Sequence, residues 1–267
     1  MSIALHSGHQ PRKRFGQNFL VDAHYIARIV AAIAPQPGDN MVEIGPGMAA
    51  LTGGLIAAAG HVSAIEIDRD LAAELAATFT PRQLTLHVAD ALAFDYATLG
   101  PALRVVGNLP YNISSPLLFY LAEYETGIRD MHVMLQREVV ARMTAAPATA
   151  DYGRLSVMLQ SRFAITRLFT VPAGAFRPAP KVESAVARLE PLGEAKPAIR
   201  DAALFARVVA AAFGQRRKTL RNALAAICDA PALEAAGIDP GARGETLSVA
   251  DFVRLSERLT PPGNASD

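Results

Sequence analysis

The feature that most constrains the fold is a series of short apolar runs that alternate with helix-length segments over about the first 195 residues. The runs are rich in β-branched residues. They are MVEIG (41–45), HVSAIEI (61–67), LTLHV (84–88), RVVGN (104–108) and MHVMLQ (131–136). Strands about 20 residues apart with helices between them are typical of a parallel sheet that is covered on both faces. We therefore expect an α/β protein with a mostly parallel sheet.

Two later runs, ITRLFTV (165–171) and SAVARLE (184–190), flank a proline-rich stretch that is too short for a crossover helix. They are expected to form an antiparallel pair at one edge of the sheet. From Pro191 onward the pattern changes, because apolar residues recur at three- and four-residue spacing, which predicts amphipathic helices.

Four such helical segments follow Pro191. They are ALFARVVAAAF (203–213), TLRNALAAI (219–227), APALEAAG (230–237) and VADFVRLSERL (249–259). Ser248 resembles a helix N-cap and Gly237 a helix stop. The sequence thus predicts an α/β domain over residues 1–194 and a small all-helical domain over residues 195–267.

Composition limits the classes of function. The chain holds 26 Lys and Arg against 25 Asp and Glu, so a polyanion would have to be recognised through local patches of charge. The single cysteine, Cys228, excludes an intramolecular disulfide framework and a cysteine-rich zinc site. The six histidines share no ligand spacing, so we expect no metal site. Without a signal peptide or an apolar run of roughly 20 residues, a cytoplasmic protein with no membrane partner is expected.

Glycines and acidic residues follow the first three predicted strands. The turn EIGPG (43–47) precedes a helix, and its glycines let a ligand approach the backbone at Gly45. Glu66 ends the second strand, where a carboxylate can accept from both hydroxyls of a ribose. Asp90 closes the third and can accept from an exocyclic amine such as that of adenine. Each feature alone also fits an ordinary turn or a solvated strand end, but together they predict a nucleoside-bearing cofactor at one crevice.

The fourth strand ends in Asn108, Leu109, Pro110 and Tyr111. A turn with a tyrosine in the core is the alternative interpretation, since turns favour these residues. The position continues the line of strand ends into the same crevice. Proline fixes the local backbone, and Tyr111 offers a flat face for a planar base.

The set EIGPG, AIEID, VAD and NLPY resembles the S-adenosylmethionine-dependent methyltransferases that modify the exocyclic amine of adenine. Three further blocks resemble those of the ribosomal RNA adenine N6,N6-dimethyltransferases, nearest to the bacterial small-subunit (16S) branch. They are RKRFGQNFLVD (12–22), FRPAPKVESAV (176–186) and FGQRRKTLRNAL (213–224). One departure is Ala49, where the family usually has glycine, and its methyl group is expected to crowd the amino-acid end of the cofactor.

The resemblance implies a Rossmann-like methyltransferase fold, S-adenosylmethionine as cofactor, and dimethylation of adenine N6 in small-subunit ribosomal RNA. Asn18 and Leu20 would close over the cofactor, and Gly45 would approach its methionine portion. Glu66 would hold the ribose, Asp90 the adenine amine, and Asn108 would bridge cofactor and substrate. The implied substrate lies within an immature small ribosomal subunit, and we expect a monomer.

Chemistry at adenine N6 assigns roles to the reactive motif. The amine is a poor nucleophile, so the Asn108 side-chain oxygen and the Leu109 carbonyl are expected to accept its hydrogens and stabilise the charge that develops on nitrogen. The target base must leave its stack, and a flat side chain then replaces the lost stacking. Tyr111 is the first candidate for this role and Phe176 the second. Phe176 is expected on an exposed loop, with core packing as the alternative.

Two basic clusters are candidate RNA contacts. The first comprises Arg12, Lys13 and Arg14. The second lies in residues 202–228, which contain no Asp or Glu, and it includes Arg216, Arg217, Lys218 and Arg221. Phosphate contacts by such cations release counterions and make binding salt-sensitive. A solvated helix face is the alternative interpretation.

Two other functions compete with this one. A large-subunit rRNA adenine methyltransferase of the antibiotic-resistance type would share the fold and the NLPY-like motif, although RRKTLRNAL fits the small-subunit branch better. A non-catalytic ribosome-assembly or transcription factor could keep the fold and bind RNA alone. The intact set of Glu66, Asp90 and residues 108–111 argues against a loss of catalysis.

Overall fold

The computed structural model describes residues 17–215 and 217–261 of the chain. The chain divides into two compact units, one of Met1–Val140 with Ala164–Pro191 and the other of Ala141–Phe163 with Leu192–Asp267.

The division lies close to the predicted boundary at one point and departs from it at another. The last segment of the second unit begins at Leu192, near the predicted boundary between residues 194 and 195. Residues 141–163, by contrast, belong to the second unit, whereas the sequence placed them in the first. The physical reason is packing, because Tyr152 and Val157 lie in the apolar core of the helical unit.

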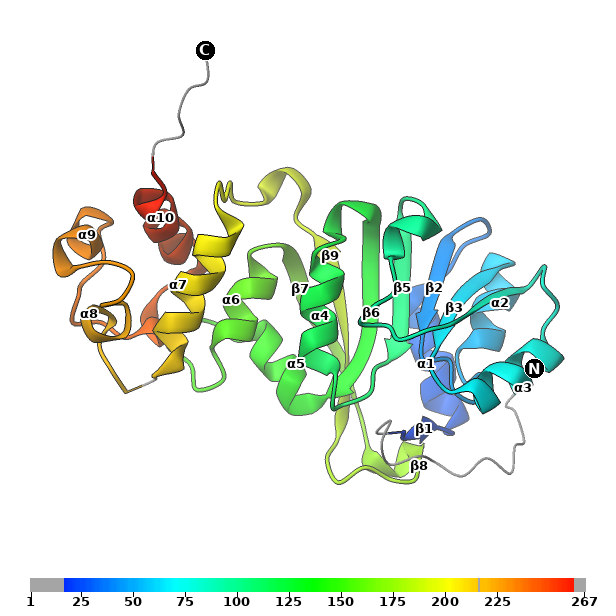
Figure 1. The fold of residues 1–267 in the computed structure, drawn as a ribbon. Coiled ribbons are helices and arrows are strands. Elements are labelled where there is room, and N and C mark those ends of the chain that lie inside the picture. Colours follow the sequence, from blue (N-terminus) through cyan, green and yellow to red (C-terminus); the bar gives the residue numbers. More distant parts are fainter. Residues whose placement is uncertain (1–16, 216, 262–267) are drawn as a thin grey trace, which may run out of the picture. The chain divides into compact units, whose positions relative to one another are not determined.

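Seven strands in the described residues of the chain form one sheet, in the order β4-β3-β2-β5-β6-β9-β7 (Figure 1). They are β2 (Asn40–Ile44), β3 (Val62–Glu66), β4 (Leu84–Val88), β5 (Leu103–Asn108), β6 (Ile128–Gln136), β7 (Phe163–Val171) and β9 (Ser184–Pro191). Strands β2 to β6 pair in parallel, and β9 runs antiparallel to β6. The predicted α/β class and mostly parallel sheet are confirmed.

The antiparallel pair at one edge is also confirmed. β7 and β9 are neighbours, and β7 is the outermost strand. The amide of Leu192, directly after β9, donates to the carbonyl of Arg162, directly before β7, at 2.9 Å. The end of one strand therefore lies beside the beginning of the other, so the two strands run in opposite directions.

Both faces of the central strands are buried, as expected for a parallel sheet that lies between layers of helix. Every residue of β3 is buried, and so are four of the five residues of β2. In register, Ile44 pairs with Ile65 and Glu66 with Val88, so the carboxyl ends of the parallel strands lie at one edge. Ligands of open α/β sheets bind at that edge.

In the first unit, α1 (Ala23–Ile33) precedes the parallel sheet, and α2 (Thr52–Ala59), α3 (Arg69–Thr78) and α4 (Ser114–Ala122) connect its parallel strands. Single 3₁₀ turns lie at Tyr96–Leu99, Glu125–Gly127 and Ala173–Ala175. A short ribbon of β1 (Phe19–Leu20) and β8 (Phe176–Arg177), paired antiparallel, joins the N-terminal segment to the chain before β9 (Figure 1). Asp22 caps α1 by accepting from the amides of His24 and Tyr25.

The remaining helices are α5 (Arg137–Thr144), α6 (Arg154–Gln160), α7 (Ala202–Gly214), α8 (Leu220–Ala223), α9 (Ala230–Ala235) and α10 (Val249–Leu259), with 3₁₀ turns at Gly193–Ala195 and Gly244–Thr246. Of these helices, α7 to α10 correspond to the four segments predicted after Pro191, whereas α5 and α6 were not predicted. α8 is shorter than predicted, because the chain turns at Leu224, whose carbonyl accepts from the amides of Ile227 and Cys228. No strand occurs in residues 192–215 or 217–261.

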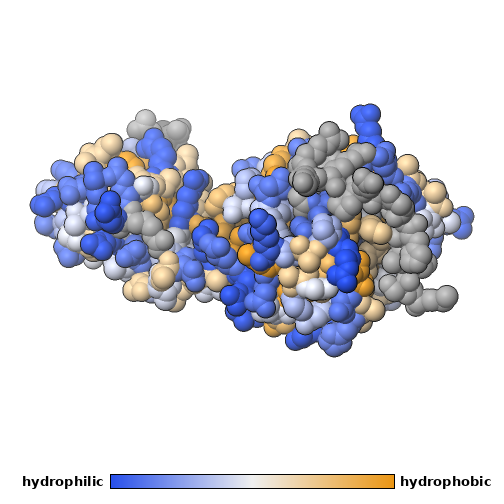
Figure 2. All heavy atoms as spheres, turned by 90° about the horizontal axis from the view of Figure 1, so that it is seen from below, coloured by the Kyte–Doolittle hydropathy of each residue, from blue (hydrophilic) through white to orange (hydrophobic). Residues whose placement is uncertain are grey.

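The caps and the core of the helical unit agree with the sequence pattern. Ser248 caps α10, since its hydroxyl accepts from the Asp251 amide at 3.2 Å and Asp251 accepts from the Ser248 amide at 2.9 Å. Gly237 follows α9 with φ +69°. Apolar side chains such as Phe205 and Phe252 are buried, and the surface of this unit seen in Figure 2 is mostly hydrophilic. Of the helices the structure describes, none has the length and apolar character needed to cross a membrane.

Candidate active site

A cavity of about 280 Å³ opens at the carboxyl ends of β2, β3, β4 and β5. Its wall combines one segment from the N-terminal region with the chain that follows each strand. The lining segments include 17–20, 43–48, 65–67, 89–92 and 108–113. The cavity thus brings together Asn18, Leu20, Gly45, Glu66, Asp90 and residues 108–111, the candidate residues taken from the strand ends and the N-terminal segment.

Glu66 fixes the glycine turn. Its Oε2 accepts from the Gly47 amide at 3.1 Å, and its Oε1 accepts from the Asp68 amide at 2.9 Å. Burial raises the pKa of Glu66, and these two hydrogen bonds counteract part of that rise. Gly47 has φ +55°, and a Cβ there would lie 3.1 Å from the ring of Phe19. Because Gly47 has no side chain, a gap remains between the backbone of the glycine turn and the N-terminal segment.

Glu43 is a second carboxyl group at this turn, and the sequence analysis gave it no role. It is buried, and its Oε2 has no hydrogen-bond partner within residues 17–215 and 217–261. Burial raises the pKa of Glu43 to about 7, the nearby Thr52 hydroxyl counteracts part of that rise, and the neighbouring Glu66 adds to it. A buried polar atom without a partner is costly, so a donor that enters the cavity would stabilise this group.

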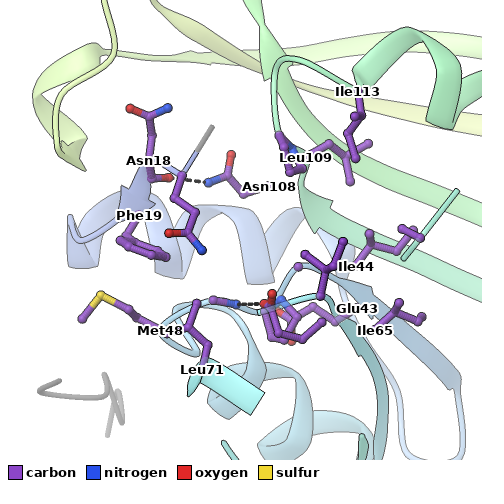
Figure 3. Close-up of a pocket in the computed structure, with 18 of the residues that line it drawn as sticks. Asn18, Phe19, Glu43, Ile44, Met48, Ile65, Leu71, Asn108, Leu109 and Ile113 are labelled. Carbon is purple, nitrogen blue, oxygen red and sulfur yellow. Dashed lines mark hydrogen bonds between the residues drawn. The ribbon is translucent and has the colours of Figure 1, made fainter. Parts of the chain in front are cut away.

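The reactive motif is held to the N-terminal segment. Asn108 donates from Nδ2 to the carbonyl of Asn18 at 2.9 Å (Figure 3). Since a carbonyl only accepts, the Asn108 amide must present its NH₂ group there, which leaves Oδ1 as an acceptor on the other side. Figure 3 shows Asn18 and Asn108 on one side of the cavity and Met48 and Leu71 on the other.

The backbone of the motif is also anchored. The Leu109 amide donates to the Met134 carbonyl of β6 at 3.1 Å. The Pro110 carbonyl accepts from the Ser114 hydroxyl at 3.0 Å and from the Ile113 amide at 3.2 Å. These bonds connect the motif to the first turn of α4, so residues 108–113 form a rigid turn.

Tyr111 lies half-buried at the cavity. Its hydroxyl and that of Ser184 are 2.6 Å apart, which fixes the direction of the ring. Burial raises the pKa of Tyr111, so the phenol stays neutral at neutral pH. Ser184 stands in the block FRPAPKVESAV, and the sequence analysis assigned it no function.

Asp90 is exposed at the loop after β4. Its Oδ1 accepts from the Leu92 amide at 2.9 Å, and its carbonyl accepts from the Ala93 amide at 3.0 Å. The Ala89 amide donates to the Glu66 carbonyl at 3.1 Å, so this loop and the end of β3 are joined.

Gly107 does not line the cavity but directly precedes Asn108, and the sequence analysis gave it no role. A Cβ at this position would lie 2.6 Å from the Ile44 carbonyl oxygen and 3.0 Å from Leu109 Cδ2. The backbones of β2 and β5 thus approach closely just before the reactive motif begins. A glycine inside a strand of β-branched residues is the signal that was available.

One expectation about the site is wrong. Phe176 is fully buried in the apolar core and does not line the cavity, because the β1–β8 ribbon pairs it with Leu20 and closes the segment that was expected to be an exposed loop. Ala49 has φ +62° and is also buried in that core. Ala49 does not line the cavity, and the crowding of the cofactor by its methyl group stays a prediction.

The basic candidates are only partly described. Arg12, Lys13, Arg14 and Arg216 lie outside the described residues. Arg217, Lys218 and Arg221 are exposed near α8. No group of three His, Cys, Asp or Glu side chains in the described part of the chain could hold a metal ion.

A family model described as "Ribosomal RNA adenine dimethylase" matches residues 8–261. The chain belongs to this family. The ribosomal RNA small subunit methyltransferase A of Aromatoleum aromaticum is 60% identical over 253 residues, which cover 95% of this chain and 96% of that protein. The protein of the same name from Thiobacillus denitrificans is 59% identical over 251 residues, covering 94% of this chain and 98% of the relative.

Solved structures of family relatives have the same fold. A dimethyladenosine transferase from Plasmodium falciparum has a TM-score of 0.75 at 24% identity, covering 89% of this chain and 95% of that chain. The 23S rRNA methyltransferase ErmE has a TM-score of 0.68 at 30% identity, covering 91% of this chain and 99% of that chain. The Rossmann-like methyltransferase fold implied by the sequence motifs is confirmed.

Members of this dimethylase family use S-adenosylmethionine, and the residues of the cavity fit that group. Gly47 leaves the space at the turn. The unpartnered Oε2 of Glu43 matches an ammonium donor such as that of a methionine portion. Carboxylates at Glu66 and Asp90 match hydroxyl and amine donors of a nucleoside. The cavity thus offers acceptors that suit the ammonium group, the ribose hydroxyls and the adenine amine of the cofactor.

Proposed function

We propose that the chain transfers two methyl groups from S-adenosylmethionine to N6 of adenines in small-subunit ribosomal RNA. The observation that carries this proposal is the bond from Asn108 Nδ2 to the Asn18 carbonyl. It leaves Asn108 Oδ1 as an acceptor for an amine, in the same cavity as the three carboxylates that fit the cofactor.

Each end of the cofactor has a proposed partner. Glu66 holds the ribose hydroxyls, Asp90 accepts from the adenine amine, and Gly45 approaches the methionine portion. Asn18 and Leu20 close the cavity from the N-terminal side. The bound cofactor supplies a methyl group on a positively charged sulfur, and this chain's work is to bind and orient the reactants.

The reactive motif acts on the target amine. The N6 lone pair is delocalised into the purine ring, so N6 is a weak nucleophile. Asn108 Oδ1 and the Leu109 carbonyl accept its hydrogens, which favours a tetrahedral nitrogen and stabilises the positive charge that develops there. Pro110 keeps the two oxygens in place. No side-chain base is needed beforehand, because the proton becomes acidic once the new bond forms.

Tyr111 receives the extruded base. Its ring lines the cavity beside Asn108, and Ser184 holds its hydroxyl. A base that leaves its stack loses stacking energy, and a flat side chain in the pocket restores part of it. Since Phe176 is buried in the core, Tyr111 alone of the two candidates takes this role.

The relatives favour the small-subunit substrate. The small subunit methyltransferases A are 59–60% identical to this chain, whereas the 23S rRNA methyltransferase ErmE is 30% identical. Exposed Arg217, Lys218 and Arg221 suit contacts with RNA phosphates. We further propose that the substrate is an assembling small subunit in the cytoplasm and that the protein acts as a monomer.

The test uses small subunits from cells that lack this activity. They are incubated with the protein and with methyl-labelled S-adenosylmethionine, and the RNA is digested to nucleosides for mass spectrometry. We expect labelled N6,N6-dimethyladenosine in small-subunit RNA and none in the large subunit. Asn108→Ala should lower the rate by at least about 10²-fold, as for loss of one group that stabilises transition-state charge.

A matched control is Asn40→Ala. Asn40 also donates to carbonyls, those of Leu99 and Pro101 at 2.9 and 3.1 Å, but at the amino end of β2. This variant should retain the unaltered rate per folded molecule. Full activity of Asn108→Ala would contradict the proposed role, and label in large-subunit RNA alone would contradict the proposed substrate.

A further inference from the structure

Two tyrosines that do not line the cavity hold the loop after β4. The Tyr96 hydroxyl donates to the Ala91 carbonyl at 3.0 Å, and the Tyr120 hydroxyl donates to the Phe94 carbonyl at 3.1 Å. Tyr96 is fully buried, and the two phenol rings pack edge to face with their centroids 6.0 Å apart. The loop that carries Asp90 is therefore fixed at two points.

The first hydroxyl acts on Asp90 through one peptide group. The Ala91 carbonyl and the Leu92 amide belong to the same planar peptide unit. Tyr96 holds the oxygen end of this unit, and its N–H end donates to Asp90 Oδ1 at 2.9 Å. The orientation of the Asp90 carboxylate thus depends on a chain of two hydrogen bonds that begins at Tyr96. Bonds linked in this way polarise and strengthen one another.

The second hydroxyl joins the loop to the reactive motif. Tyr120 lies on α4, which begins at Ser114 directly after residues 108–113. The Ser114 hydroxyl donates to the Pro110 carbonyl, so the helix and the motif are connected. Tyr120 also shares a hydrogen bond with the Tyr124 hydroxyl at 3.0 Å. One helix therefore supports both the substrate motif and the far end of the Asp90 loop.

We propose that Tyr96 and Tyr120 are positioning residues that set the Asp90 carboxylate for recognition of the exocyclic amine of the cofactor's adenine. This inference rests on the proposed function. Loss of the Tyr96 hydroxyl frees the 91–92 peptide to rotate, and Asp90 then loses its fixed direction. Selectivity for a 6-amino purine falls, while the fold and the rest of the cavity are retained.

The experiment is a calorimetric titration with two ligands, S-adenosylhomocysteine and S-inosylhomocysteine, which carries an oxygen in place of the amine. The unaltered protein should prefer the adenosine ligand by about 10- to 100-fold, the range of a hydrogen bond to a charged group. Tyr96→Phe should lower this preference by about three- to tenfold and leave the affinity for S-inosylhomocysteine unchanged. Tyr120→Phe should have a smaller effect, because Phe94 is farther along the loop from Asp90.

Tyr152→Phe is the matched control. Tyr152 is also buried, but its hydroxyl has no hydrogen-bond partner in the described residues, and it belongs to the helical unit. It should leave both affinities unchanged, and thermal melting should show all three variants folded.

The outcomes separate this inference from the proposed function. If Tyr96→Phe keeps the full preference, or loses affinity equally for both ligands, the positioning role is overturned and the proposed function stands. If the unaltered protein binds neither ligand, the proposed function is overturned together with this inference.

Discussion

Gly107→Ala tests whether the close approach of β2 and β5 positions the reactive motif. The new Cβ would lie 2.6 Å from the Ile44 carbonyl oxygen, and contacts under 3.0 Å essentially never occur, so one backbone must move by about 0.4 Å. Overpacking of this kind costs about 1–3 kcal/mol of unfolding free energy. The lower flexibility of alanine in the unfolded chain offsets about 0.4–1 kcal/mol of that loss. We expect a net loss of about 1–2 kcal/mol.

The same shift should slow methyl transfer. Asn108 is the next residue, and a displacement of about 1 Å at reacting groups lowers a rate by about 10²-fold, so a shift of about 0.4 Å should lower kcat by about tenfold. Kinetics at saturating substrate measure this effect. Denaturation followed by tyrosine fluorescence measures stability, and every tyrosine except Tyr152 belongs to the first unit.

Gly127→Ala is the control for this prediction. A Cβ at Gly127 meets no atom within 4 Å. This variant should be as stable as the unaltered protein or more so, with an unchanged rate. If Gly107→Ala matches it in both stability and kcat, the close approach does not position Asn108.

Two further predictions follow from charge. The pKa of Glu43 is about 7 in the folded chain, against an ordinary value of about 4.5, so stability should fall as pH rises from about 4.5 to 7 and then level off. Unfolding of Glu43→Gln should lack this decline of about 3 kcal/mol, and parallel pH profiles for the two proteins would disprove the assignment. For RNA, replacing both Arg217 and Arg221 by Ala should lower the slope of log affinity against log salt by about 1.4–1.8 without a change in melting temperature. An unaltered slope would place the RNA elsewhere.

The sequence was sufficient for features that depend on local pattern. β-branched runs such as HVSAIEI form strands because burial on both faces favours them at every position of β3. Ser248 caps α10 because its hydroxyl meets an amide three residues on. The convergence of strand ends at one cavity also followed, since parallel strands share an edge.

Features that depend on distant parts of the chain could not be predicted. Phe176 is buried because it pairs with Leu20, and nothing in either segment alone indicates that partner. The sequence pattern assigned residues 141–163 to the first unit, and only the packing of Tyr152 in the apolar core of the helical unit shows that they belong to the second. Arg104 likewise bonds the side chains of Asp39 and Asp130 in a buried cluster that no spacing reveals.

Residues that act through other residues were missed for the same reason. Tyr96 and Tyr120 belong to no motif on which the sequence argument relied, and Ser184 stands in the block FRPAPKVESAV without an assigned function. The three hydroxyls matter through the backbone or ring that each one holds. Glu43 was visible in the turn, but its missing partner is a property of the folded cavity.

The most direct test of the central claim is a crystal structure of this chain with S-adenosylhomocysteine bound. The account predicts the ligand at the carboxyl ends of β2 to β5, with its ribose hydroxyls on Glu66, its purine amine at Asp90 and its sulfur beside Asn108. A ligand bound elsewhere, or one whose purine points away from Asp90, would contradict the account.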